Sequence, residues 1–189
     1  MNSTWGSVLF SRSAGIAIWL LSAFVAVNAH GKVFFSQNEA LELAFPDAEE
    51  VTSNTFILDE DQVARIESLA KCELDSKLVK IYTGIREGKV LGYALIDVHN
   101  VRTLPEAFMV VLSPTGQVRS LRVLAFHEPL EYKPTDRWYR QFDNRSIEAP
   151  LRLGGDVHGV VGATLSARAT TRGVRRALAF YEVLLHGGD

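Results

Sequence analysis

The chain has 189 residues, of which 47% are hydrophobic, so it is long enough to bury a substantial core. Its 20 basic and 22 acidic residues nearly balance, which gives no overall field for nucleic acid and argues against a nucleic-acid partner. The single cysteine, Cys72, excludes an intramolecular disulfide. The five histidines are scattered without the close pairing of a zinc site, so we expect no bound metal.

The N-terminal segment has the pattern of a targeting signal. Arg12 precedes an apolar run over residues 14–27, and Val27 and Ala29 occupy the small-residue positions of a cleavage site. The apolar run is shorter than the ~20 residues of a comfortable membrane span. We therefore expect residues 1–29 to be a signal peptide, with an uncleaved anchor as the alternative, and residues 30–189 to form one exported domain.

The first part of that domain reads as helix, strand and helix. Ser36 and Glu39 have the spacing of a capping box, which predicts a short helix that ends near Phe45. Residues 51–58 are β-branched and alternating, which is typical of a strand. Residues 59–70 follow with apolar side chains at helical spacing and acidic residues at the start, where the helix dipole favours them.

From residue 78 the apolar pattern changes to period two. Residues 78–83 and 89–98 predict one hairpin, and residues 108–112 and 118–126 predict a second, joined by a Pro-Thr-Gly turn. Helices come before and after these strands rather than between them. The pattern predicts an α+β fold, with a twisted antiparallel sheet, short N-terminal helices and a long C-terminal helix.

Two further helices are predicted near the C-terminus. Residues 135–142 indicate a short helix that presents Trp138, Tyr139 and Phe142, which either wall a ring-shaped cofactor or seal the sheet. Residues 167–186 form the long amphipathic stretch, with Ser166 as its expected N-cap.

The turn before this long helix contains the strongest candidate for a functional site. Gly159 and Gly162 permit close backbone approach, and Thr164 places a hydroxyl where helix amides and the helix dipole favour an anion. The spacing alone is also common in loops that bind nothing.

The run Gly162-Ala163-Thr164-Leu165-Ser166 resembles the flavinylation motif of the FMN-binding domain family. That family includes the small periplasmic flavin subunits of the Rnf complex and of the sodium-pumping quinone reductase. The resemblance implies that Thr164 carries FMN through a phosphodiester bond made by a dedicated flavin transferase. Where the family motif has an aspartate and a hydroxyl residue before the threonine, this chain has His158 and Val161.

Other residues are candidate contacts of the same cofactor. Arg168 lies in the first turns of the predicted helix and is our first choice for a phosphate contact. His158 comes from the same turn, and His127 and Glu128 follow the last predicted strand, where loops commonly build sites. For each histidine the alternative is an exposed side chain with no role.

The function predicted is therefore an exported electron-transfer protein with FMN on Thr164, located in the periplasm or at the outer face of the inner membrane. Its partners would be the flavin transferase and membrane-bound or periplasmic redox proteins. The sequence has no nucleophile elbow and no Gly-x-Gly-x-x-Gly dinucleotide motif, so an electron carrier is favoured over a self-contained enzyme, and no catalytic residue is assigned. The alternatives are non-covalent FMN binding and a cofactor-free exported interaction domain.

Overall fold

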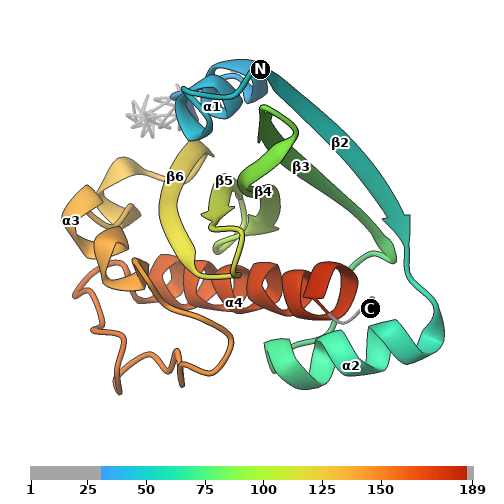
Figure 1. The fold of residues 1–189 in the computed structure, drawn as a ribbon. Coiled ribbons are helices and arrows are strands. Elements are labelled where there is room, and N and C mark those ends of the chain that lie inside the picture. The colour runs from blue at the N-terminus through green and yellow to red at the C-terminus, as the bar shows by residue number, and fades with distance from the viewer. Residues whose placement is uncertain (1–30, 187–189) are drawn as a thin grey trace, which may run out of the picture.

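A computed structural model describes residues 31–186 of the chain, so the expected signal segment lies outside the described residues. A six-stranded antiparallel sheet has the strand order β1-β6-β5-β4-β3-β2, and a long helix, α4 (Thr164–Tyr181), runs across it (Figure 1). The predicted α+β fold is thereby confirmed. No helix within residues 31–186 has the length and apolar character needed to cross a bilayer.

Strands β3 to β6 form an antiparallel meander, and β2 and β1 extend the sheet at its two edges. Both hairpins predicted from the period-two pattern are present. The two-residue strand β1 pairs Lys32 with Phe126 and was not predicted, because two residues are too few to show a periodicity. The strands are β1 (Lys32–Val33), β2 (Glu50–Ile57), β3 (Leu78–Arg86), β4 (Lys89–Asn100), β5 (Pro105–Leu112) and β6 (Val118–Phe126).

Short helices flank the sheet at both ends of the chain. The first two begin with the capping boxes that their sequences favour: Ser36 with Glu39, and Asp59 with Gln62. Beyond Tyr181 the last helix continues as a π-helical turn to His186. The three short helices are α1 (Gln37–Ala44), α2 (Glu60–Ala70) and α3 (Asp136–Tyr139), and single 3₁₀ turns cover Leu130–Tyr132 and Arg140–Phe142.

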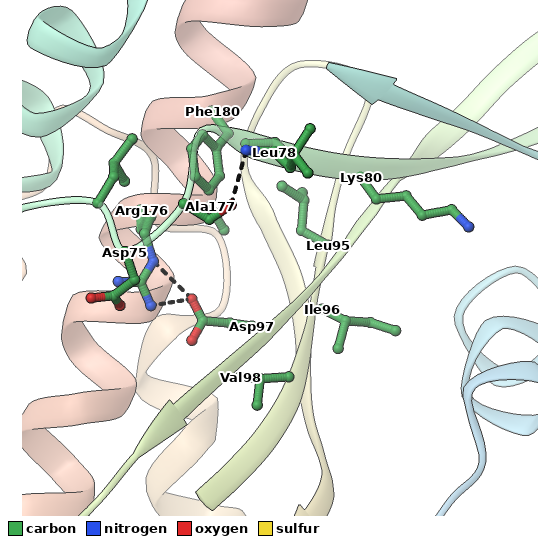
Figure 2. A pocket seen from close by; sticks show the side chains of 13 residues that line it. Asp75, Leu78, Lys80, Leu95, Ile96, Asp97, Val98, Arg176, Ala177 and Phe180 are labelled. Carbon is green, nitrogen blue, oxygen red and sulfur yellow. Dashed lines mark hydrogen bonds and ion pairs between the residues drawn. The ribbon is translucent and has the colours of Figure 1, made fainter. Parts of the chain in front are cut away.

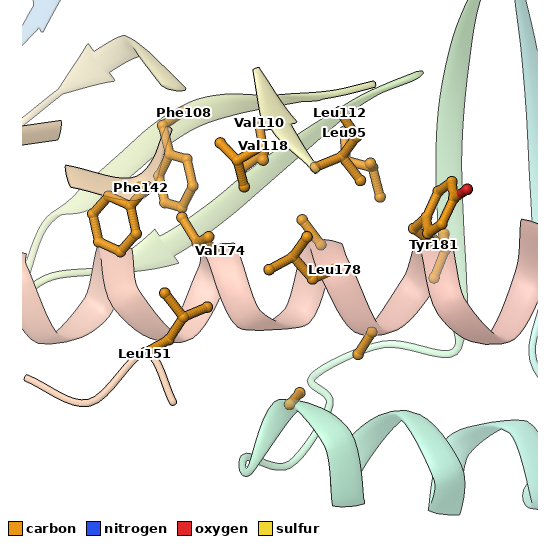
Figure 3. Packing of buried hydrophobic residues seen from close by; sticks show 14 of the residues in the cluster. Leu95, Phe108, Val110, Leu112, Val118, Phe142, Leu151, Val174, Leu178 and Tyr181 are labelled. Atoms are coloured by element: carbon orange, nitrogen blue, oxygen red, sulfur yellow. The ribbon is translucent and has the colours of Figure 1, made fainter. Parts of the chain in front are cut away.

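Alternation along β5 divides the core between the two faces of the sheet. Phe108 and Val110 point toward α4, where they pack with Val174 and Leu178 (Figure 3). Met109 and its same-face neighbours pack instead in the cluster that contains α1. Burial on both faces explains why this strand reads as a continuous apolar run.

The aromatic residues of α3 and of the 3₁₀ turn that follows it belong mainly to this core. Tyr139 and Phe142 are buried in the cluster beneath α4, which agrees with the interpretation that they seal the sheet. Trp138 is half-buried, and its indole Nε1 donates a hydrogen bond of 2.7 Å to the carbonyl oxygen of His158. This bond fixes the loop that leads toward α4.

Arg175 joins α4 to the end of α2. Its guanidinium group is buried and donates to the carbonyl oxygens of Leu69, at 2.8 Å, and Ala70, at 3.3 Å. A third bond, of 2.5 Å, reaches the carbonyl of Pro150. The last carbonyls of a helix have no intrahelical donors, so Arg175 supplies the missing donors at the C-terminus of α2.

Candidate functional site

The long helix begins at Thr164, three residues earlier than the sequence predicted. Its N-cap is Ala163, and no side chain caps the helix there. The prediction that Ser166 is the N-cap is wrong: its hydroxyl lies inside the first turn, is buried, and donates a hydrogen bond of 2.5 Å to the carbonyl of Tyr132. The turn before the helix uses Gly162 at φ 84°, a conformation that glycine adopts without strain.

The Thr164 side chain is exposed at this helix start. Its Oγ1 donates one hydrogen bond, of 3.3 Å, to the carbonyl of Val160. Within the described residues, the first-turn amides of Thr164, Leu165 and Ser166 have no hydrogen-bond acceptor. A hydroxyl oxygen and unpaired N–H groups therefore lie together at the positive end of the helix dipole, which is the arrangement that binds phosphate oxygens.

A cavity of about 190 Å³ opens beside Thr164. Residues 162–166 form one wall, and Val101, Arg102, Glu128 and Tyr132 form the rest. Arg102 is exposed and brings a guanidinium group to the cavity from the β4–β5 connection. Sequence reasoning missed Arg102 and Tyr132, because both are far from Thr164 along the chain and neither belongs to a motif.

Glu128 also lines this cavity, but its carboxylate faces the backbone. One oxygen, Oε1, accepts hydrogen bonds from the amides of Thr103, at 2.7 Å, and Leu104, at 2.9 Å. The bond from Thr103 lowers the pKa of Glu128 more than burial raises it. Glu128 therefore holds in place the connection that carries Arg102, and it acts on the cavity through that residue.

The other three predicted contacts do not line the Thr164 cavity. His158 is exposed, and its backbone is fixed by Trp138 and by Gln141, whose Oε1 accepts from the His158 amide at 2.7 Å. His127 directs Nδ1 to the carbonyl of Pro105, at 3.1 Å. Arg168 is exposed one turn along α4 and lines a different hollow.

Two apolar side chains are exposed next to Thr164. Val161 is fully exposed and Leu165 is 45% exposed. Val161 stands where the resembled motif has a hydroxyl residue, and it faces solvent rather than the core. Leu165 also lines the cavity, so the surface next to the threonine offers apolar groups that a flat ring system can contact.

A buried ionic cluster lies beneath α4. The His99 ring directs Nδ1 to Asp97, at 2.8 Å, and Nε2 to Glu106, at 3.3 Å. Arg176 donates to the second oxygen of Asp97 (Figure 2). Burial alone would lower the pKa of His99, but its bonds to the two carboxylates raise it to about 9. Both ring nitrogens are engaged, so we interpret this cluster as structural.

No group of three or more His, Cys, Asp and Glu side chains that could hold a metal ion occurs in residues 31–186. Comparison of the chain with models of known protein families finds no match, and comparison with curated proteins finds no relative. The geometry around Thr164 and the motif that contains it are therefore the features that indicate a function.

Proposed function

We propose that the protein is an exported electron carrier that holds FMN through a phosphodiester bond to the hydroxyl of Thr164. The observation that carries the proposal is the environment of that hydroxyl, which is exposed and followed by three unpaired amides at a helix start. The motif from Gly162 to Ser166 supports the same residue independently of the fold.

The residues around Thr164 fit the phosphate of such a cofactor. A phosphodiester keeps a negative charge, which unpaired helix amides and a nearby guanidinium group stabilise. Arg102 supplies that guanidinium group at the cavity wall. An added Cβ at Gly162 would meet no atom within 4 Å, so the turn leaves open space beside the threonine.

The cavity is smaller than the roughly 300–1,000 Å³ of pockets that enclose a whole ligand. The ring system would therefore remain partly exposed over Val161 and Leu165. When bound, FMN supplies one-electron and two-electron chemistry, and exposure of the ring favours transfer to another protein. The residues of the chain anchor and shelter the cofactor, and no substrate pocket is needed for this role.

The decisive experiment is production of the full-length protein together with a flavin transferase, followed by denaturation and mass spectrometry. We expect covalent flavin on the peptide that contains Thr164, and complete loss of it in Thr164→Val, which removes only the hydroxyl. Thr164→Ser keeps a hydroxyl and Ser166→Ala removes a neighbouring one, and both variants should still be modified at position 164. Flavin that is released by denaturation would replace the covalent proposal with non-covalent binding, and colourless protein would contradict both.

Arg102 gives a graded test of the same site. We expect Arg102→Gln to slow flavin attachment by about tenfold, because one charge-assisted contact to the phosphate is lost. Arg137 is also exposed but lies on α3, outside the cavity lining. Arg137→Gln should therefore leave the rate unchanged. Equal rates for the two variants would remove Arg102 from the site.

A further inference from the structure

A second hollow lies on the far side of α4 from the sheet. It is bounded by α4, by the end of α2 and by the segment over residues 150–156, which Figure 1 shows below α4. Its volume is about 590 Å³, which is within the usual range for small-molecule sites. It is separate from the Thr164 cavity, since the two share no lining residue.

Positive charge is concentrated around this hollow. Five of the 20 basic residues of the chain line it, against a single lining carboxylate, although the whole chain is slightly acidic. Arg168 and Arg172 project from one face of α4 at i, i+4 spacing. The remaining basic residues are Lys71, Arg152 and Arg175.

These basic side chains have no ion-pair partner among the residues that the structure describes. Within residues 31–186, no ion pair involves any of the five basic residues. The lining carboxylate, Asp156, accepts hydrogen bonds from the amides of Leu151, at 3.0 Å, and Arg152, at 2.8 Å. It is also 3.7 Å from Arg145. The carboxylate of Asp156 therefore stabilises the loop to which it belongs.

Arg175 places a buried positive charge at this hollow. The residue is 6% exposed, and its bonds to three carbonyl oxygens use three of its five N–H donors. The other two have no acceptor among the described residues. Arg175 therefore keeps a positive charge at the wall of the hollow, and together with Arg168 and Arg172 it favours a negatively charged occupant.

The rest of the lining is apolar. Leu151 is buried, Leu153 is half-buried, and Pro150 and Ala70 complete this surface. A concave site with apolar and cationic surfaces matches a small molecule that combines an apolar body with a charged group. Its concave shape favours a small ligand over the surface of an acidic protein. Because guanidinium groups bind phosphate oxygens in a forked geometry, phosphate is the charged group that fits best.

We propose that this hollow is a binding site for an organic phosphate ester of mononucleotide size. The phosphate is bound by Arg168, Arg172 and Arg175, and the apolar part of the ligand contacts Leu151 and Leu153. The site does not depend on flavin attachment at Thr164.

Isothermal titration calorimetry of the full-length protein with AMP and with inorganic pyrophosphate tests the proposal. Both should bind, more weakly as salt is raised. The double variant Arg168→Gln/Arg172→Gln should weaken the binding of both ligands by tenfold or more. Loss of a single charge-assisted contact already corresponds to about tenfold, and this variant removes two arginines. The matched double variant Arg65→Gln/Arg137→Gln removes two exposed arginines elsewhere and should leave both affinities within about twofold of the original.

Two further variants distinguish this site from the first. Leu153→Ser should weaken the binding of AMP and leave the affinity for pyrophosphate unchanged, because only AMP has a part that contacts the apolar surface. Thr164→Val should bind AMP as the original protein does. The proposal is overturned if neither AMP nor pyrophosphate binds, if the two double variants behave alike, if Thr164→Val abolishes AMP binding, or if only an acidic polypeptide such as polyglutamate binds.

Discussion

Helices α2 and α4 both begin at the protein surface, but they differ in how their terminal backbone groups are hydrogen-bonded. At the start of α2, the Asp59 carboxylate accepts a hydrogen bond of 2.7 Å from the backbone N–H of Gln62. The side-chain Oε1 of Gln62 accepts one of 3.1 Å from the backbone N–H of Asp59. At its end, Arg175 donates to the last carbonyls. The chain thus satisfies both ends of α2 with its own side chains.

The start of α4 has no such arrangement. Ala163 cannot cap with its methyl group, and Ser166 directs its hydroxyl to Tyr132 instead. Side-chain caps typically contribute about 1 kcal/mol to stability, so an uncapped helix start forgoes a contribution that was easily available. The comparison indicates that α2 serves the stability of the fold, whereas the start of α4 is left uncapped, as the proposed attachment of FMN requires. Changes in the first region should therefore alter stability, and changes in the second should alter binding.

The largest expected effect on stability is at Arg175. We expect Arg175→Leu to lower the free energy of unfolding by about 3 kcal/mol, because three carbonyl oxygens lose a charged donor. Chemical denaturation measures the change. Arg172→Leu removes an exposed arginine of the same helix and should cost less than about 0.5 kcal/mol. Similar losses in the two variants would show that Arg175 does not secure the end of α2.

The next effect comes from the ionic cluster beneath α4. The pKa of His99 is about 9 in the folded protein, against 6.5 for an ordinary histidine side chain. Between pH 6.5 and pH 9, His99 is therefore protonated in the folded state and largely deprotonated in the unfolded state. Its contribution to stability is complete below about pH 6.5 and is lost as pH rises through about 9. We expect a loss of about 2 kcal/mol between pH 7 and pH 9.

Denaturation curves over this pH range provide the measurement, and His99→Gln is the control. In that variant the decrease between pH 7 and pH 9 should disappear, because glutamine does not titrate. A decrease of the same size in the variant would assign the effect to another group. None of His99, Asp97 and Glu106 lines the Thr164 cavity, so the pH range should not change flavin attachment through His99.

A smaller effect is expected at the capped start of α2. Asp59→Ala should lower the free energy of unfolding by about 1 kcal/mol, since the Gln62 amide loses its acceptor. Asp61 is an exposed acidic residue of the same first turn that makes no cap. Thermal unfolding should show a clearly smaller shift for Asp61→Ala than for Asp59→Ala.

The smallest effect on stability should be at the open helix start. Thr164→Val removes one long hydrogen bond from an exposed side chain, so we expect a change of less than about 0.5 kcal/mol in the free energy of unfolding. The same variant should lose covalent flavin entirely. A loss of stability comparable to that of Asp59→Ala would mean that Thr164 serves the fold, and the contrast between the two helices would fail.

The elements that the sequence predicted correctly are those with a local cause. The capping box at Ser36, the helical spacing over residues 59–70 and the alternation from Leu78 to Phe126 need only neighbouring residues for their effect. The start of α4 was misplaced for the same reason. Ser166 satisfies the local preference for an N-cap, but its hydroxyl is drawn to Tyr132, which is 34 residues away along the chain.

The candidate site was predictable only where it is a continuous motif. Residues 162–166 were found because they lie together in sequence, and Glu128 was selected for its place after a strand. Arg102 reaches the cavity through tertiary structure alone, as does the contact between Arg175 and α2. Arg168 looked closest to Thr164 along the chain, yet it lines another hollow, because adjacent turns of a helix can serve different surfaces.

The bond between Trp138 and His158 has a practical consequence for measuring the state of the protein. Of the three tryptophans in the chain, Trp138 is the one within residues 30–189. Its indole is hydrogen-bonded to the loop that leads to Thr164, and it is half-buried. Tryptophan emission from this domain therefore originates beside the proposed attachment point. Loading with a yellow chromophore should quench that emission by energy transfer, which gives an optical readout of occupancy without any added label.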